Sequence, residues 1–288
     1  MGLLDKLFKV SSKTNLRSRF ELLREAISGT MSTFYMARDR KTKEVVGLKI
    51  LDREKTAALE ARFVGIKKPK EGEIAMEIVH PHIVRTMEHG VSTDNEQFLV
   101  MEFLDGPGLN SLIVGRSQKL NSRRMMLLRQ AAEAVAAVHD AGYIHRDICP
   151  RNFVVDKECR SLKLIDFGLT VPAVPPYTLP GNRTGTANYM APEVVRRRPT
   201  SHRLDIFSFG VTAFELCAFE LPWPRGTGVA AMTHGAVEPT DIRKFCPDID
   251  PKLEKAIYAC LEADPERRPA SMKDFLAMIK GVKHENAA

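Results

Sequence analysis

Two short motifs in a fixed order constrain this chain more than any other feature of its sequence. The triplet His145-Arg146-Asp147 leads to Asn152, and the triplet Asp166-Phe167-Gly168 then closes a short hairpin pattern. One such triplet alone would be weak evidence. Found together in this order, they predict a compact segment that carries chemistry rather than a set of ordinary turn residues.

The residue types in this segment match the needs of phosphoryl transfer. That reaction depends on positioning and charge neutralisation, so it needs one carboxylate to accept a hydroxyl proton and further oxygen ligands to hold Mg²⁺ on the phosphates. Asp147, Asn152 and Asp166 supply these groups. Each residue taken singly would be a turn residue, but the ordered set indicates a functional site.

Further stretches extend the pattern in a consistent order. They are Val46-Gly47-Leu48-Lys49, Gly185-Thr186-Ala187-Asn188-Tyr189-Met190-Ala191-Pro192-Glu193, Asp205-Ile206-Phe207-Ser208-Phe209-Gly210 and Asp264-Pro265-Glu266-Arg267-Arg268-Pro269. Over roughly residues 20–280 the chain therefore resembles a eukaryotic-type (Hanks-type) serine/threonine protein kinase catalytic domain. The resemblance also implies a buried ion pair between Glu193 and Arg268.

The resemblance implies an α+β, bilobal protein-kinase-like fold, with a small antiparallel β lobe and a large, mainly helical lobe. Strand-like runs dominate up to Met101, and helical periodicity follows, with Ser122 expected to cap a helix that ends at Gly142. The expected parts are an N-terminal extension and linker (1–19), a kinase domain (20–280) made of a small lobe (20–101), a hinge (102–106) and a large lobe (107–280), and a C-terminal tail (281–288).

Individual roles also follow from the resemblance. Asp147 would orient the acceptor hydroxyl, Lys49 would contact the α- and β-phosphates, and Glu71 would pair with Lys49. We prefer Glu71 to Glu73 or Glu77 because the residues three and seven positions after it are isoleucines, which turn one helix face to the core. Asn152 and Asp166 would hold Mg²⁺ (or Mn²⁺) on ATP, and Arg146 and Thr186 would support the site. The residues expected to contact the nucleotide are Ile27, Gly29, Phe34, Gly47, Met101 (the gatekeeper position), Glu102, Leu104 and Val154.

The sequence departs from the family pattern in the loop that covers the phosphates. Ile27, Gly29 and Ser32 stand where the family has glycines, and only Gly29 is retained. Glycines let backbone N–H groups approach phosphates without an intervening Cβ. We therefore expect a loop that folds differently or holds ATP less closely, or a repacked but working pocket in which Phe34 and Gly47, in place of the usual Val and Ala, offset each other in volume.

A second departure is Cys149, which stands where serine/threonine kinases usually carry a lysine that steadies the γ-phosphate. Losing one such group costs about 3–4 kcal/mol of transition-state stabilisation, which predicts a slow enzyme. Arg151 on the same loop is a candidate substitute for the missing cation. Two interpretations of Cys149 stay open, a reactive thiol and an inert one.

The expected acceptors are Ser or Thr hydroxyls of protein substrates, because Thr186 lies where the family contacts the acceptor, although Arg151 resembles tyrosine kinases. Arg146 beside the expected base implies regulation by a phosphate group on the activation segment, since a dianion would give the guanidinium a strong partner. Thr178 and Thr184 are the candidate phosphosites. The alternative is that both are unmodified loop residues.

Composition narrows the setting of the chain. Its 288 residues carry 43 Lys and Arg against 36 Asp and Glu, a net charge of +7, and we expect no nucleic-acid partner because the acids dilute the basic groups. Five cysteines without a C-x-x-C pair argue against a disulfide framework or a zinc ribbon. Neither a membrane span nor a signal peptide is expected, so the expected location is cytoplasmic. The apolar residues near the N-terminus (Leu3, Leu4, Leu7, Phe8) suggest a short appended helix.

Two alternatives to an active protein kinase stay open. The thin glycine loop, Phe34 and Cys149 would also fit a pseudokinase that binds nucleotide weakly or not at all and serves as a scaffold. A small-molecule kinase of aminoglycoside or choline type shares the Asp and Asn logic, but the stretch Ala191-Pro192-Glu193 argues against it, because such enzymes lack this platform for protein substrates. The oligomeric state is not predicted.

Overall fold

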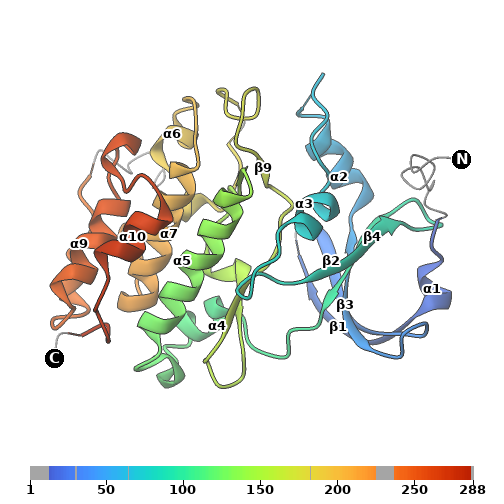
Figure 1. Cartoon of the computed structure of the whole chain (residues 1–288), viewed down its shortest axis with the longest axis horizontal. Helices are drawn as coiled ribbons and strands as arrows, with labels where there is room; N and C mark the ends of the chain where they lie inside the picture. Colours follow the sequence, from blue (N-terminus) through green and yellow to red (C-terminus); the bar gives the residue numbers. More distant parts are fainter. Residues whose placement is uncertain (1–12, 30, 64, 182, 225–236, 287–288) are drawn as a thin grey trace, which may run out of the picture. The chain divides into compact units, whose positions relative to one another are not determined.

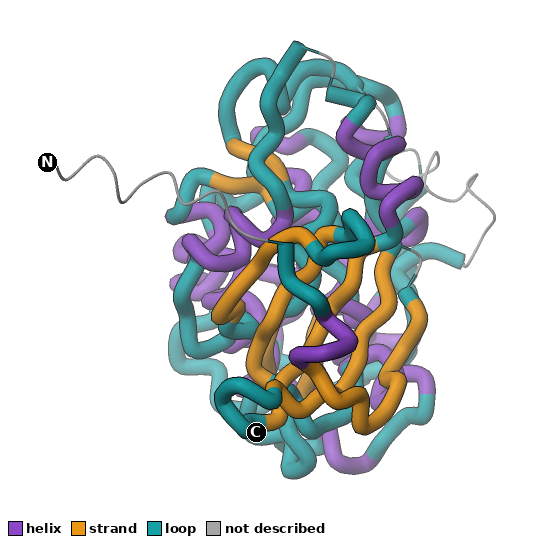
Figure 2. The backbone as a smooth tube through the Cα atoms, turned by 90° about the vertical axis from the view of Figure 1, so that its right-hand side faces the viewer, coloured by secondary structure: helices purple, strands orange, loops and turns teal. Residues whose placement is uncertain are grey.

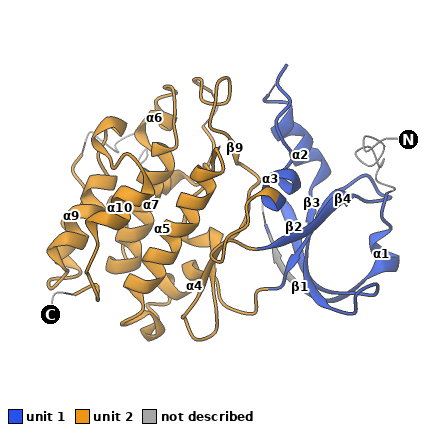
Figure 3. Cartoon of the chain, in the orientation of Figure 1, with its two compact units in different colours: residues 1–76, 85–103 blue, residues 77–84, 104–288 orange. Residues whose placement is uncertain are grey.

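The computed structural model describes residues 13–29, 31–63, 65–181, 183–224 and 237–286, with the backbone alone for 25–28. The expected helix at Leu3 to Phe8 lies outside these residues. The chain divides into two compact units, residues 1–76 with 85–103 and residues 77–84 with 104–288 (Figure 3). A mainly β unit 1 and a mainly helical unit 2 confirm the expected α+β class.

Unit 1 is built on a five-stranded antiparallel sheet with strand order β1-β2-β3-β5-β4. A turn at Lys43, which has a φ of 67° and whose N–H donates to the Asp39 carbonyl, joins β2 to β3. The strands are β1 (Phe20–Ser28), β2 (Ser32–Asp39), β3 (Val45–Leu51), β4 (Thr86–Val91) and β5 (Gln97–Glu102).

A short N-terminal helix, α1 (Leu16–Arg19), lies over one face of this sheet (Figure 2). Its Leu16 packs on the apolar cluster of that face, and Arg19 forms ion pairs with Asp39 at 2.8 Å and Glu88 at 2.7 Å. The cluster consists of Phe20, Ala37, Val46, Leu48, Phe98 and Val100. Residues 13–19 are thus part of the packed unit and not a loose linker.

Two helices follow β3 in the chain. α2 (Arg53–Glu60) is capped by Asp52, whose carboxylate accepts the N–H of Lys55, and it buries none of its residues. α3 (Glu71–Glu77) buries Glu71 and Ile74, so its inner face includes a charged group. A buried carboxylate requires a partner, and α3 therefore marks a site.

The boundary between the units lies between Phe103 and Leu104, within the range expected for the hinge. Residues 77–84, which the sequence placed in the small lobe, belong instead to unit 2. The reason is backbone pairing: the Val84 N–H donates to the Leu164 carbonyl, and the Leu164 N–H donates to His82. Such long-range pairing leaves no local sequence signal.

Unit 2 contains most of the helices (Figure 1). Its strands form two short pairs, β6 with β9 and β7 with β8. The elements are α4 (Leu109–Val114), α5 (Arg124–Asp140), β6 (Tyr143–Ile144), β7 (Phe153–Val155), β8 (Leu162–Leu164), β9 (Val171–Pro172), α6 (Pro192–Val195), α7 (Arg203–Ala218), α9 (Pro251–Cys260) and α10 (Met272–Met278), with 3₁₀ turns at Gln118–Leu120, Pro150–Asn152, Ala187–Tyr189, Ile242–Lys244 and Pro265–Arg267.

The expected helix after the hinge is α5, but its cap was predicted wrongly. Ser122 has a φ of 59° and does not cap the helix, and the N-cap residue is Arg123, without a side-chain cap. The 3₁₀ turn at Gln118–Leu120 sets the chain direction here and leaves Ser122 in a left-handed turn. Gly142, with a φ of 81°, follows the end of α5 as expected.

The centre of unit 2 is α7, whose residues from Leu204 to Ala218 are all buried. Phe209 packs edge-on against Phe275 of α10, and Phe207 stacks on Trp223. A helix that is buried on all sides is expected to be apolar, so the buried Asp205 within it needs a specific reason. Asp205 has such a reason, because it accepts backbone N–H groups of the loop that follows β6.

The C-terminal tail is also packed. Glu285 is buried and lies 3.1 Å from the Arg124 guanidinium at the start of α5. Val282 also contacts α5, because its carbonyl accepts a hydrogen bond from Arg129. The Asp250 N–H donates to the carbonyl of Glu285. None of the described helices is long and apolar enough to cross a membrane.

Candidate active site

A buried carboxylate of α7 holds the loop that carries the first motif. Asp205 Oδ2 accepts the N–H of His145 at 2.7 Å, and its Oδ1 accepts the N–H of Arg146 at 2.8 Å. His139 Nε2 lies 3.0 Å from Oδ2. Burial would raise the pKa of Asp205, but these hydrogen bonds and the neighbouring histidines lower it, so the carboxylate is ionised and fixes the loop.

Two residues of the motifs have strained backbone conformations. Arg146 has a φ of 70° and Asp166 a φ of 69°, both in the left-handed region that side chains other than glycine rarely adopt. Such conformations persist where surrounding contacts over-determine them, as Asp205 does for Arg146. Gly185, with a φ of 115°, is needed where it stands, because a Cβ there would lie 2.7 Å from the Arg146 carbonyl oxygen.

Both carboxylate oxygens of Asp147 receive hydrogen bonds. Oδ1 accepts from the N–H and from the Oγ1 hydroxyl of Thr186, each at 2.8 Å. Oδ2 accepts from Nδ2 of Asn152 at 2.9 Å, and the same amide nitrogen lies 2.7 Å from the Asp147 carbonyl. These contacts fix the orientation of the carboxylate, as a group that must accept a proton from a positioned hydroxyl requires.

The residues expected to hold a metal suit Mg²⁺ chemically. Asn152 donates from its Nδ2, so its amide oxygen is the atom that could ligate a metal ion. Asp166 Oδ1 accepts the N–H of Gly168 at 3.0 Å, and this bond orients the carboxylate. No group of three or more His, Cys, Asp or Glu side chains in the described part of the chain could hold a metal ion. Mg²⁺ is commonly held by one or two protein oxygens together with water and substrate phosphates, and this pair fits that pattern.

Unit 1 contains a buried ion pair. Lys49 Nζ of β3 lies 2.6 Å from Glu71 Oε1 of α3, and both side chains are less than a tenth exposed. Glu71, and not Glu73 or Glu77, makes this contact. Glu73 instead accepts the N–H of Lys70, and Glu77 accepts the hydroxyl of Tyr143.

Next to Lys49, an aromatic ring replaces a missing methyl group. Phe34 pairs with Lys49 across β2 and β3, so both side chains point to the same face of the sheet. A Cβ at Gly47 would lie 2.7 Å from Cζ of Phe34 and 3.0 Å from Cγ of Met101. The ring therefore occupies the space that an alanine at position 47 would need.

The remaining expected nucleotide residues are placed as follows. Met101 and Glu102 end β5, where the Glu102 carboxylate accepts the N–H of Arg85, and Leu104 begins the second stretch of unit 2. Val154 lies in β7 opposite Lys163. Ile27 pairs with Phe34 through its backbone, and Gly29 closes the turn between β1 and β2 by donating to the Ser32 carbonyl at 2.9 Å.

Cys149 is buried beside Thr186, with Sγ 3.7 Å from the threonine hydroxyl. Burial, together with the charge of Asp147, raises the pKa of this thiol to about 12. The thiol is therefore protonated and unreactive at neutral pH, which favours the inert interpretation. Arg151 is exposed on the same loop.

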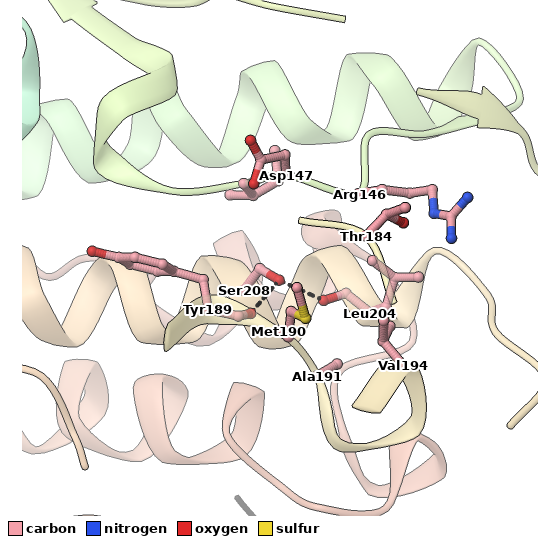
Figure 4. Close-up of a pocket in the computed structure, with 10 residues that line it drawn as sticks. Arg146, Asp147, Thr184, Tyr189, Met190, Ala191, Val194, Leu204 and Ser208 are labelled. Atoms are coloured by element: carbon pink, nitrogen blue, oxygen red, sulfur yellow. Dashed lines mark hydrogen bonds between the residues drawn. The ribbon is translucent and has the colours of Figure 1, made fainter. Parts of the chain in front are cut away.

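Arg146 and Thr184 lie side by side at one end of a small pocket in unit 2 (Figure 4). Burial lowers the pKa of the Arg146 guanidinium, and the Thr184 hydroxyl is buried without a hydrogen-bond partner among the described residues. Thr178 does not line this pocket, and its backbone carbonyl accepts the N–H of Thr200. The other residues that line the pocket are Asp147, Ile148, Tyr189, Met190, Ala191, Val194, Leu204 and Ser208.

The segment after the site is anchored by the ion pair expected from the sequence. Arg268 donates to both carboxylate oxygens of Glu193, at 2.7 and 2.9 Å, and the arginine side chain is fully buried. Its guanidinium also lies 4.9 Å from the centre of the Phe207 ring. The pair fixes α6 to the core of unit 2.

Sequence reasoning missed the contacts that support the site. It placed Asp205 on a core helix without assigning it the backbone amides of the loop, and it assigned no role to His139 or to Glu215, which accepts the hydroxyl of Tyr189. One signal was available: Asp205 and Glu215 are carboxylates in an otherwise apolar helix, and a buried carboxylate needs donors.

Comparison with known proteins gives a consistent result. The family model described as "Protein kinase domain" matches residues 20–278. The chain is 31% identical over 269 residues to serine/threonine-protein kinase pkn3 of Myxococcus xanthus, an alignment that covers 89% of the chain and 48% of that protein. It is 27% identical to serine/threonine-protein kinase PrkC of Bacillus subtilis, with 92% of the chain and 40% of that protein covered. The chain thus spans less than half the length of these relatives.

Proposed function

The chain belongs to the protein kinase domain family, and on this premise we propose that it transfers the γ-phosphoryl group of ATP to Ser or Thr hydroxyls of protein substrates. The family and the fold expected from the sequence are confirmed by the family-model match. We propose that the kinase domain spans residues 20–280 and that its partners are protein substrates with a Ser or Thr acceptor.

In this function Asp147 accepts the hydrogen bond of the acceptor hydroxyl and takes its proton as the oxygen attacks the γ-phosphorus. The bond from the γ-phosphorus to the oxygen that bridges it to the β-phosphate breaks, and ADP leaves with that oxygen. Lys49, held by Glu71, contacts the phosphates. Asn152 and Asp166 would hold Mg²⁺, which neutralises phosphate charge when bound.

The observation that carries the proposal is the environment of Asp147. Thr186 fixes one of its oxygens through two bonds, and Asn152 fixes the other. A carboxylate that served only to hold a turn would not need this orientation from a segment 39 positions further along the chain. This arrangement presents the carboxylate to a second hydroxyl group, that of the substrate.

Ser/Thr specificity is supported by two observations. Thr186 lies beside Asp147, where an acceptor side chain would be contacted, and the relatives described above are named serine/threonine-protein kinases. Regulation by phosphorylation is supported by the desolvated guanidinium of Arg146 next to Thr184, since a phosphate group at Thr184 would give it a charge-assisted partner. Thr178 remains a second candidate.

The test is transfer from γ-labelled ATP, with Mg²⁺ or Mn²⁺, to peptides that carry a single Ser, Thr or Tyr, followed by mapping of the protein's own phosphosites. We expect metal-dependent labelling of the Ser and Thr peptides, loss of labelling in Asp166→Asn, and unchanged labelling in Asp156→Asn, which lies outside the site. Nucleotide binding without any transfer would instead support the scaffold alternative.

A further inference from the structure

The chain segment around the acceptor site carries an unusual balance of charge. Between Phe167 and Thr200 the charged residues are Arg183, Glu193 and the triplet Arg196-Arg197-Arg198. Glu193 is buried and already paired with Arg268. Every exposed charge of this segment is therefore positive, and Arg151, four positions after Asp147, adds another exposed guanidinium.

Among the described residues, no carboxylate forms an ion pair with Arg151, Arg183 or the triplet 196–198. Five other arginines of unit 2 have such a partner. Arg116, Arg124, Arg203, Arg243 and Arg268 pair with Glu220, Glu285, Glu266, Glu254 and Glu193, respectively.

The arginines on the segment lie together. Arg183 Nε donates to the carbonyl of Val195 at 2.9 Å, which brings its side chain to the end of α6 where the triplet begins. We call Arg183, Arg196, Arg197 and Arg198 the arginine surface. Arg183 is close in sequence to Thr186, which bonds Asp147, so this surface adjoins the place where the acceptor hydroxyl is bound.

The backbone of the triplet is fixed. The N–H groups of Arg196, Arg197 and Arg198 donate to the carbonyls of Pro192, Val194 and Glu193, and Arg197 adopts a φ of 53°. α6 is itself anchored through the ion pair of Glu193. The guanidinium groups thus project from a rigid turn, which lowers the entropic cost of binding an extended ligand.

We propose that this kinase selects acidic acceptor segments, in which Asp, Glu or phosphorylated residues flank the Ser or Thr and contact the arginine surface and Arg151. The inference rests on the proposed function and specifies its substrate class. Arginine binds carboxylate and phosphate groups through two parallel N–H bonds, so such a surface favours acidic chains over basic ones. A peptide fits better than other anions because these charges lie on the segment that carries Thr186 and on the loop that carries Asp147.

The test compares three peptides that differ only in the residues flanking one central Thr, which are Glu, Ala or Lys. The variant carries Arg196→Glu, Arg197→Glu and Arg198→Glu. A matched control carries Lys252→Glu, Lys255→Glu and Lys280→Glu, which are exposed and remove the same charge from α9 and the end of α10.

We expect the natural protein to use the Glu peptide with a kcat/KM about tenfold or more above that of the Lys peptide at low salt, since several exposed pairs act together. The triple Arg variant should lose or invert this preference and still label the Ala peptide, whereas the control keeps it. Raising the ionic strength should shrink the preference, because exposed charges are screened.

A second readout separates this inference from the proposed function. Anisotropy of the same peptides, labelled with fluorescein, on the Asp147→Asn protein reports binding without turnover. Salt-sensitive binding of the Glu peptide that the triple variant loses supports the acidic class even if no transfer occurs. Equal use or binding of the Glu and Lys peptides overturns it while transfer to the Ala peptide continues, and so does stronger binding of anionic phospholipid vesicles than of the Glu peptide.

Discussion

Lys49 Nζ lies 2.6 Å from Glu71 Oε1, and the two side chains are buried together between a strand and a helix of unit 1. Both charges are largely removed from water, so losing either member of the pair is costly. The pair therefore has two functions. It holds α3 against β3, and in the proposed function it fixes the lysine that contacts the phosphates.

Removal of one partner should be costly. Glu71→Gln removes the carboxylate that lies 2.6 Å from the buried Lys49 ammonium, and we expect a loss of about 3–5 kcal/mol in the free energy of unfolding together with weaker ATP binding. Glu73→Gln on the same helix is the control and should cost less than about 1 kcal/mol, because its side chain is exposed. Urea denaturation measures both, and equal effects would contradict the account.

Phe34 and Gly47 should behave as a coupled pair. Gly47→Ala places a Cβ 2.7 Å from the Phe34 ring, which must then move, and overpacking of this kind costs about 1–3 kcal/mol. Phe34→Val in the same chain should restore most of the loss, giving a coupling energy of about 0.5–3 kcal/mol. The four proteins of the cycle are compared by urea denaturation and by binding of a fluorescent ATP analogue. Additive effects would show that the ring does not occupy this space.

The ion pair between Arg268 and Glu193 should matter far more than an exposed one. Arg268→Ala leaves the Glu193 carboxylate buried and unpaired, and we expect a loss of about 3–5 kcal/mol. Arg243→Ala removes an arginine whose side chain is 43% exposed, and it should cost far less than Arg268→Ala. Thermal unfolding of the two variants side by side gives the comparison, and a reversed order would contradict it.

Cys149 should resist alkylation in the folded protein. Because burial raises the pKa of its thiol to about 12, iodoacetamide at pH 8 should label it only after unfolding, as peptide mass mapping would show. The folded state favours the neutral thiol. The contribution of Cys149 to the free energy of unfolding is therefore fully present below the unfolded pKa of about 9 and is lost as the pH rises toward 12. Rapid labelling of native Cys149 would restore the reactive interpretation.

Local patterns were sufficient where one element carries its own signal. The family resemblance implied that Lys49 pairs with a helix glutamate, and the isoleucines that follow Glu71 at helical spacing selected it from three candidates. The resemblance also identified Phe34 and Gly47 as exchanged residues, and compensation in volume was one of the two expectations for this pocket. Helical periodicity reports which side of α3 faces the core, and Phe34 and Gly47 lie on adjacent strands of one sheet, so spacing and size were enough once the resemblance was recognised.

The rest depends on contacts between distant parts of the chain. Residues 13–19 looked like a polar linker, yet Arg19 pairs with Asp39 and Glu88, and a charged residue does not indicate its partner in the sequence. Serine often caps helices, but Ser122 follows a 3₁₀ turn and adopts a left-handed conformation. Tertiary context overrode local preference at both positions.

The most direct test of the central claim is the transfer of labelled phosphate by the Asp147→Asn protein. The substitution preserves size and removes the charge that accepts the hydroxyl proton. If Asp147 is the base, transfer to a Thr peptide falls by about 10²–10⁴-fold while nucleotide still raises the melting temperature as in the natural protein. Transfer that continues at the natural rate, or that is absent from both proteins although each binds nucleotide, would contradict the account.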